Sequence, residues 1–259
     1  MELELAGKVA IVTVSSKGIG RAAALGFIKE GASVVICARG REALDETVAA
    51  AGASARERIA AVQADLTDLA AIRRVVDKAI AEFGQIDILV NNAGSARPGD
   101  FLKIPDDDWK LDFELKFFGY VRMARAVLAK MADRRSGVII NVIGTGGLAP
   151  SAGYMVGGAA NAALNHFTKA LAAEGAKHGV RAVGINPGPI LTERLELFLK
   201  QRGGNQSREE ITRRMTPLGR PGTAEECADL IMFLASRRAA FIHGANITID
   251  GGANPGLIG

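Results

Sequence analysis

The sequence predicts a single doubly wound α/β domain built on one parallel β-sheet. Short apolar runs of strand length alternate with helical stretches along the 259 residues, and a Gly-rich loop follows the first run. Repeated strand–helix units require right-handed crossovers and a parallel sheet that is covered by helices on both faces. A chain of this length can bury a sufficient core in one domain, so we expect residues 1–259 to form one unit.

The first strand–loop–helix unit is the part of the chain most suited to binding a phosphate. Residues 9–12 are apolar, residues 13–20 are rich in Ser and Gly, and helical spacing resumes at residues 22–28. A loop that opens into a helix N-terminus presents unpaired N–H groups and the positive end of the helix dipole, which suits a pyrophosphate. Gly18 and Gly20 would let the backbone come close to it, although an ordinary β-α turn is the alternative interpretation.

The remaining elements continue the alternation. Strands are expected at residues 33–38, 58–64, 86–90, 137–143, 180–185 and 246–249, and helices at residues 42–51, 68–83, 106–131, 153–178 and 223–236. Ligands of such sheets bind beyond the carboxyl ends of the strands, where Gly18, Arg39, Asp65, Asn92 and Asn141 all fall. The polar segment 193–214 is interpreted as a lid over the substrate, with a plain surface loop as the alternative.

Basic residues near the first two strands bear on the choice of cofactor. Arg39 stands at the end of the second strand, where a dinucleotide fold places the group that meets the adenosine ribose. An acidic residue there would favour NAD, whereas Arg39 and Lys17 offer positive charge to a 2′-phosphate. We therefore expect NADP rather than NAD, unless Arg39 is only a solvated member of the basic run 39–41.

Composition excludes several classes of protein. The net charge of +4 is too small and too dispersed to indicate a nucleic-acid partner. Cys37 and Cys227 lack metal-ligand spacing and are expected to be inert packing residues, and we expect no metal site. The first residues show no signal pattern and no apolar run reaches spanning length, so we expect a cytoplasmic protein with no membrane partner.

Several motifs spread along the chain resemble, in their order, those of the short-chain dehydrogenase/reductase family. They are SSKGIG (15–20), Asp65, NNAG (91–94), Tyr154 before a long helix, PGPILT (187–192), PLGRPG (217–222) and ITIDGG (247–252). The bacterial 3-oxoacyl carrier-protein reductase type looks most similar. The resemblance implies a Rossmann-type dinucleotide-binding domain, a nicotinamide cofactor, hydride transfer between an alcohol and a carbonyl, and a homodimer or homotetramer built through two long helices.

The same resemblance implies which residues contact the cofactor. The pyrophosphate would be lined by Ser16, Lys17 and Ile19, the adenine by Asp65 and Leu66, and the cofactor ribose by Asn92, Ala93, Gly94 and Tyr154. The nicotinamide amide would be contacted by the segment Pro187, Gly188, Ile190 and Thr192.

The active site departs from the family pattern of an Asn, a Ser, a Tyr and a Lys four residues after the Tyr. If Tyr154 is the family Tyr, the Lys position holds Gly158. If the helix is instead aligned on FTKALA (167–172), the Tyr, Lys and Ser positions hold Gly157, Asn161 and Gly144, and both registers stay open. The Asn position holds Lys116 and the usual Gly after Thr13 is Val14, a β-branched residue that resists positive φ.

One hypothesis is that the missing positive charge is supplied by Lys116. A cation within roughly 4–6 Å stabilises a phenolate, so Tyr154 could act as general acid in carbonyl reduction and as base in the reverse direction. Asn141 or Asn161 could donate an amide N–H to the substrate oxygen or to the ribose, with Thr145 and Ser151 as alternative hydroxyl donors. A snorkelling Lys116, or one paired with Asp112, is the alternative.

Three functions therefore stay open for this pocket. The first is an NADP(H)-dependent oxidoreductase that interconverts a carbonyl and an alcohol on a small or acyl-type substrate. The second is a catalytically impaired pseudo-enzyme that serves as a structural or regulatory partner, which Val14 and the second register favour. The third is a lyase or dehydratase that uses Tyr154 and Lys116 without net redox chemistry.

Overall fold

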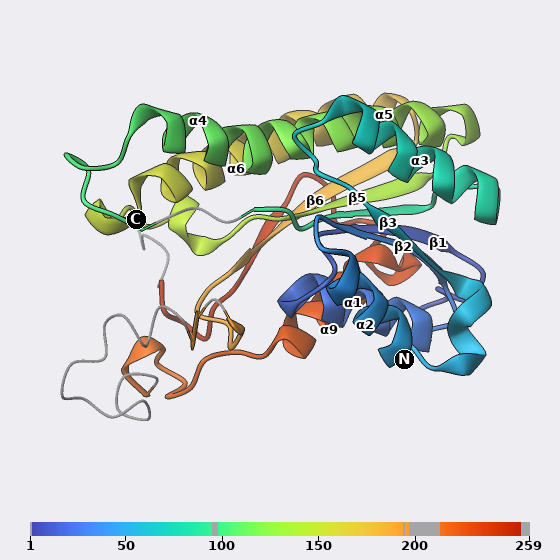
Figure 1. Ribbon diagram of the computed structural model, residues 1–259, viewed down its shortest axis with the longest axis horizontal. Coiled ribbons are helices and arrows are strands. Elements are labelled where there is room, and N and C mark those ends of the chain that lie inside the picture. The colour runs from blue at the N-terminus through green and yellow to red at the C-terminus, as the bar shows by residue number, and fades with distance from the viewer. Residues whose placement is uncertain (1, 95–97, 194, 197–212, 255–259) are drawn as a thin grey trace.

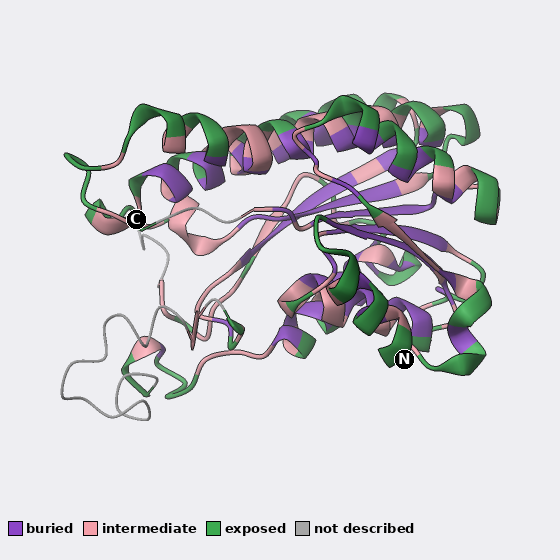
Figure 2. Cartoon of the chain, viewed as in Figure 1, coloured by how far each residue is buried: buried purple, intermediate pink, exposed green. Residues whose placement is uncertain are grey.

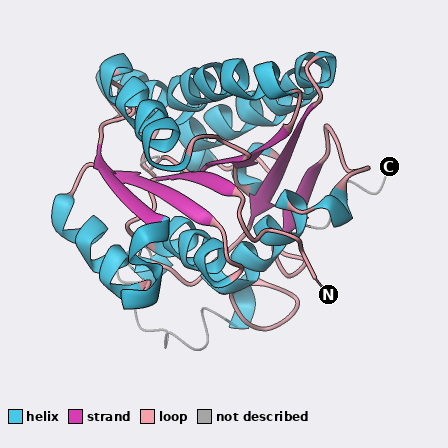
Figure 3. Cartoon of the chain, turned by 90° about the vertical axis from the view of Figure 1, so that its right-hand side faces the viewer, coloured by secondary structure: helices cyan, strands magenta, loops and turns pink. Residues whose placement is uncertain are grey.

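The computed structural model describes residues 2–94, 98–193, 195–196 and 213–254 (Figure 1). A seven-stranded parallel sheet in the order β3-β2-β1-β4-β5-β6-β7 lies between two layers of helices. Helices α3, α4, α5 and α6 cover one face, and α1, α2 and α9 cover the other (Figures 1 and 3). The doubly wound, single-domain α/β fold predicted from the alternating pattern is confirmed.

The elements follow the predicted order along the chain. The first half contains β1 (Val9–Thr13), α1 (Gly18–Lys29), β2 (Ser33–Ala38), α2 (Arg41–Ala50), β3 (Ile59–Gln63) and α3 (Leu69–Phe83). The second half contains β4 (Ile88–Asn91), α4 (Asp106–Phe113), α5 (Gly119–Arg134), β5 (Gly137–Val142), α6 (Met155–Lys177), β6 (Val180–Pro187), α9 (Ala224–Ala235) and β7 (Asn246–Ile249).

The central strands are mainly apolar because both of their faces are buried (Figure 2). Successive side chains of a strand point to opposite faces. In β1, Ile11 therefore belongs to the core cluster that contains Tyr120 and Met123 of α5, while Val12 belongs to the cluster that contains Phe27 of α1. Polar side chains such as Asn91 and Asn141 enter the buried strands near their carboxyl ends, and this edge of the sheet holds the candidate site.

The chain reverses its direction of winding between β1 and β4. The strand order runs outward from β1 through β2 and β3 on one side, and from β4 to β7 on the other. In open α/β sheets the crevice beyond the carboxyl ends at such a switch point is where ligands bind. There the Asn92 N–H, just after β4, donates to the hydroxyl of Thr13, the last residue of β1, at 2.8 Å.

The two largest departures from the predicted boundaries both lie near the site. Helix α1 begins at Gly18, four residues before its predicted start, so the Gly-rich segment forms its first turn. The helix predicted over residues 106–131 is interrupted: a π-helical turn, Glu114–Phe118, separates α4 from α5. Most of the predicted lid at 193–214 lies outside the described residues.

Within the described ranges, no helix is both long enough and apolar enough to cross a membrane. The same part of the chain contains no group of three or more His, Cys, Asp or Glu side chains that could hold a metal ion. Cys37 and Cys227 are both free and buried.

Candidate active site

The loop between β1 and α1 is held in place by buried polar side chains. Ser15 Oγ donates to the Val12 carbonyl at 2.9 Å and accepts from the Cys37 N–H of β2 at 3.1 Å. The Asn92 side chain donates to the carbonyl of Val14 at 3.1 Å and that of Thr13 at 3.3 Å. Asn92 was predicted to contact the cofactor ribose; in the structure its amide nitrogen also ties the loop to the end of β4.

Two residues of this loop have left-handed backbone conformations. Gly18 has φ +54°, and Val14 has φ +48°. A β-branched side chain in this region costs about 1–2 kcal/mol, so Val14 is a site of backbone strain. Gly20 is required for a different reason, since a Cβ there would lie 2.5 Å from both the Val14 carbonyl oxygen and the Asn92 amide nitrogen.

Contacts join this loop to the segment that follows β6. A Cβ at Gly18 would lie 3.2 Å from Thr192 Cγ2, so the predicted pyrophosphate loop and the predicted nicotinamide segment lie together. The Lys17 ammonium pairs with the exposed Glu193 carboxylate at 2.6 Å, and this hydrogen bond raises the pKa of Lys17. Lys17 was predicted to offer its charge to a 2′-phosphate; here that charge has an acidic partner.

The residues predicted to lie beside the adenosine follow β2 and β3. Arg39 is exposed, and its carbonyl accepts from the Gln63 side chain at 2.8 Å. Asp65 Oδ1 accepts from the Thr67 N–H at 3.0 Å and from its hydroxyl at 2.9 Å, which shapes the turn before α3. Leu66 is buried beside this turn. The predicted adenine residues therefore form one preorganised loop.

Lys116 is buried at the end of β5. Its side chain is only 6% exposed, and its amine donates to the Ile143 carbonyl at 2.9 Å. A Cβ at Gly94, which has φ +132°, would lie 2.9 Å from the Lys116 stem, so this predicted ribose residue lies directly against Lys116. The snorkelling alternative is therefore wrong, because the amine is directed into the protein rather than into solvent.

Tyr120 is a site residue that the sequence reasoning missed. It lies four residues after Lys116, and its hydroxyl donates to the Val142 carbonyl at 2.6 Å. Burial raises the pKa of Tyr120, and the proximity of Tyr154 raises it further. The π-helical turn and the start of α5 thus each donate to one of two consecutive carbonyls at the end of β5, and the spacing of four residues was the signal that could have indicated it.

Tyr154 and Asn161 meet the loop that follows β5. Tyr154 is half-buried and precedes the first residue of α6, and a Cβ at Gly146 would lie 3.0 Å from its ring. A Cβ at Gly144 would lie 3.0 Å from the Asn161 amide nitrogen. Asn161 is 2% exposed, and within the described part of the chain its side-chain oxygen has no hydrogen-bond partner. The structure therefore brings together residues from both registers considered above.

Asn141 lies inside the protein rather than on the surface of the crevice. Its amide nitrogen donates to the Thr168 hydroxyl of α6 at 2.9 Å, and its oxygen accepts from the Asn91 side chain at 3.0 Å. Both ends of this amide therefore join β4, β5 and α6, and the structure does not bring Asn141 to the substrate side. Of the alternative hydroxyl donors, Thr145 is partly buried and Ser151 is exposed.

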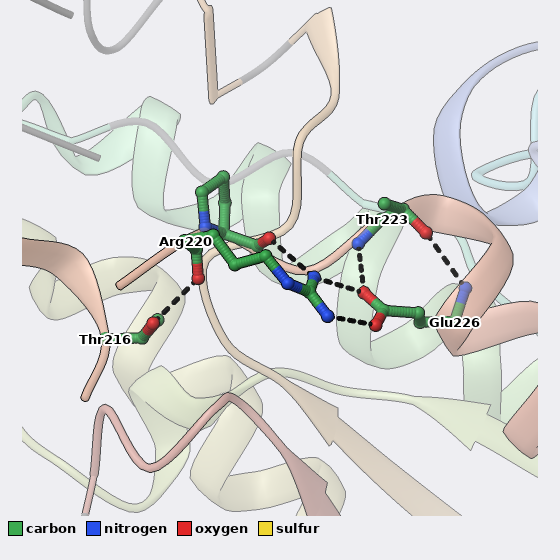
Figure 4. A network of polar contacts seen from close by, with 5 residues as sticks. Thr216, Arg220, Thr223 and Glu226 are labelled. Atoms are coloured by element: carbon green, nitrogen blue, oxygen red, sulfur yellow. Dashed lines mark hydrogen bonds and ion pairs between the residues drawn. The ribbon is translucent and has the colours of Figure 1, made fainter. Parts of the chain in front are cut away.

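A polar network fixes the segment that leads into α9 (Figure 4). The Arg220 guanidinium donates to both carboxylate oxygens of Glu226, at 2.9 and 2.6 Å, and the Thr216 hydroxyl donates to the Arg220 carbonyl. Glu226 and Thr223 form a capping box at the start of the helix. The Gly222 N–H donates to the Pro189 carbonyl at 2.9 Å, so the network also supports the PGPILT segment.

Comparison with known proteins identifies the family. A family model described as enoyl-(acyl carrier protein) reductase matches residues 13–254. The 3-oxoacyl-[acyl-carrier-protein] reductase of Escherichia coli (strain K12) is 36% identical over 253 residues, which cover 95% of this chain and 97% of that protein. The chain belongs to the short-chain dehydrogenase/reductase family. The resemblance inferred from the motifs is thus confirmed.

Solved structures of other reductases share this fold. L-sorbose reductase from Gluconobacter frateurii, complexed with NADPH and L-sorbose, has a TM-score of 0.93 and 33% identity, and covers 99% of this chain and 100% of its own. The 3-ketoacyl-(acyl-carrier-protein) reductase from Brucella melitensis, complexed with NADH, has a TM-score of 0.87 and 30% identity, with coverage of 96% and 99%.

This membership defines the reaction class of the chain. As a short-chain dehydrogenase/reductase it is an enzyme that acts on CH–OH and carbonyl groups with a nicotinamide cofactor. The similarity to proteins named as reductases supports this class over the pseudo-enzyme alternative.

Proposed function

We propose that the protein is an NADP(H)-dependent oxidoreductase that interconverts a carbonyl and an alcohol on a small or acyl-type substrate, with Tyr154 as general acid and base. The observation that carries the proposal is the buried Lys116 amine at the end of β5, against Gly94. An ammonium is seldom buried unless its charge is used or paired. The Lys116 amine and the Tyr120 hydroxyl donate to adjacent backbone carbonyls, and the proximity of Tyr154 raises the pKa of Tyr120.

The residues present suit a nicotinamide cofactor. The buried oxygen of Asn161 lacks a donor among the described residues, and a ribose hydroxyl would supply one. Ser16, Lys17, Gly18, Ile19 and Gly20 would hold the pyrophosphate, and Asp65 and Leu66 would contact the adenine. The segment with Pro187, Gly188, Ile190 and Thr192 would contact the nicotinamide, with Asn92, Ala93 and Gly94 beside the ribose. When bound, this cofactor supplies or accepts the hydride.

The chain's own contribution is to move a proton and to stabilise charge. Tyr154 would donate its phenolic proton to the substrate oxygen during reduction and would take it back during oxidation. The Lys116 charge would stabilise the phenolate left behind, because opposite charges attract strongly where water is excluded. Asn161 would orient the ribose in place of the family Lys, whereas Asn141 keeps the neighbouring strands in register.

The preference for NADP is supported by Arg39. Its exposed side chain stands at the end of β2, while Lys17 is paired with Glu193. Arg39→Ala should weaken NADPH binding about tenfold and leave NADH binding unchanged, because it removes charge that only a 2′-phosphate uses. Cofactor fluorescence titration measures both. Arg41→Ala is the matched control, since Arg41 already pairs with Asp45 at 2.9 Å. Equal weakening for both cofactors would contradict the proposal.

The reaction class can be tested by following NADPH absorbance with a panel of ketones, aldehydes and 3-oxoacyl thioesters. The proposal predicts substrate-dependent oxidation of NADPH. Turnover without NADPH consumption would indicate lyase or dehydratase chemistry instead. Tight NADPH binding without turnover of any panel member would favour a catalytically impaired protein.

A further inference from the structure

The π-helical turn Glu114–Phe118 is the element that directs Lys116 into the protein. Lys116 is its buried residue. Such a turn holds one residue more than an α-helical turn, and its removal would rotate the following side chains by about 100°. The hydrogen bond from the Lys116 amine to the Ile143 carbonyl therefore depends on the contacts that stabilise the π-helical conformation of this turn.

Arg122 contacts both ends of the turn from α5. Its guanidinium forms a hydrogen-bonded ion pair with Glu114, the first residue of the turn, and both side chains are partly buried. The same group lies 5.5 Å from the centre of the Phe118 ring, the last residue of the turn. A single side chain thus connects the start and the end of the π-helical segment.

Arg122 also reaches the adenine side of the crevice. It donates to the Thr67 carbonyl at 3.3 Å. Thr67 in turn donates twice to the Asp65 carboxylate, so the Arg122 contact and the predicted adenine residue share one short loop. The π-helical turn and the adenine loop are therefore joined through one guanidinium.

We propose that Arg122 is a positioning residue that holds the π-helical turn, and with it Lys116, against the loop expected to receive the adenine. The inference rests on the proposed function, which gives Lys116 its catalytic role. Arg122 acts on the site through Lys116, because its own contacts are with Glu114, Phe118 and Thr67.

The test compares four variants of the full chain: Arg122→Met, Lys116→Met, the double variant and Arg122→Lys. The rate kcat is measured with NADPH and the panel carbonyl that the wild type reduces fastest. Arg122→Met should lower kcat about tenfold, because small displacements of catalytic groups have effects of this order. The double variant should be no slower than Lys116→Met, and Arg122→Lys should recover part of the rate by keeping the charge beside Glu114.

The matched control is Arg125→Met, which removes an exposed arginine from the same helix and should leave kcat unchanged. A wild-type kcat in Arg122→Met, or a double variant slowed by the product of the two single effects, would overturn the inference. If Arg122 had a purely structural role, Arg122→Met would lower the melting temperature, and its effect on kcat would be the same with and without Lys116. Unchanged kcat in Lys116→Met would instead overturn the proposed function, and the inference with it.

Discussion

The β-branched side chain of Val14 disfavours the left-handed backbone conformation that its position requires. The turn after β1 needs a left-handed residue, and the chain supplies a β-branched one at φ +48°. The hydrogen bond from Asn92 to the Val14 carbonyl and the close packing of Gly20 keep this conformation in place. The strain thus lies beside the expected phosphate position.

Replacing Val14 separates strain from packing. Val14→Gly and Val14→Ala both remove the branched side chain, but only glycine adopts a positive φ without strain. We expect the free energy of unfolding of Val14→Gly to exceed that of Val14→Ala by about 1 kcal/mol, measured by urea denaturation. Equal stabilities would contradict the assignment of strain to this residue.

Contacts of individual side chains are the part of the structure that the sequence predicts least well. Arg39, Asp65, Asn92 and Lys116 could be placed near the site because they follow strands or occupy a family position. Asn141 forms hydrogen bonds with Thr168 and Asn91, which come from distant segments of the chain, and no local sequence pattern predicts such contacts. The pairing of Lys17 with Glu193 was not predicted for the same reason.

Among the secondary-structure elements, the sequence predicts best the strands whose starts are marked by a preceding glycine. The strands Ser33–Ala38 and Asn246–Ile249 have their predicted bounds, because each directly follows a Gly-Ala pair, at 31–32 and 244–245. The π-helical turn could not be predicted, since one added residue hardly alters the hydrophobic periodicity of residues 106–131. Its support comes from Arg122 and from the Lys116 contact with Ile143.

The start of α9 makes a pH-dependent contribution to stability. Hydrogen bonds from Arg220 and from the Thr223 backbone lower the pKa of Glu226 from 4.5 to about 2. A carboxyl group whose pKa is lower in the folded state stabilises the fold above its ordinary pKa, and that contribution is lost as pH falls from about 4.5 toward 2.

Glu226→Gln should therefore reduce the dependence of stability on pH. Between pH 5 and pH 3, the urea midpoint should fall less in Glu226→Gln than in the wild type. Glu225→Gln, at the neighbouring exposed position of the same first turn, is the control and should retain the wild-type dependence. A wild-type pH dependence in Glu226→Gln would contradict the assigned role of the Arg220 network.

At the scale of the whole molecule, the switch point between β1 and β4 brings the predicted residues to one edge. The alternating pattern predicted this topology because right-handed crossovers leave few arrangements for such a chain. It also predicted that Gly18 and Asn92 would lie at this edge, beyond the carboxyl ends of the strands. The close approaches of Gly18 to Thr192 and of Gly94 to Lys116 bring the segment after β6 and the π-helical turn to the same edge.

The reactivity of the two cysteine thiols can be used to test whether the domain unfolds cooperatively. Cys37 lies in β2 and Cys227 in α9, and burial raises the pKa of each thiol to about 12. Both thiols should resist a disulfide reagent such as Ellman's reagent in the native protein and react only as the chain unfolds. Because the domain should unfold as one unit, mass spectrometry should find both labelled at the same rate. Faster labelling of either one would indicate local opening.

The proposed chemistry requires that the Lys116 amine supports proton transfer by Tyr154. The direct measurement is the rate of NADPH oxidation by Lys116→Met and Tyr154→Phe, with the exposed Lys110→Met as control and circular dichroism to verify the fold. We expect both site variants to lose about 100-fold or more in kcat, as loss of general acid catalysis does, and Lys110→Met to match the wild type. A Lys116→Met enzyme that turns over at nearly the wild-type rate would contradict the account.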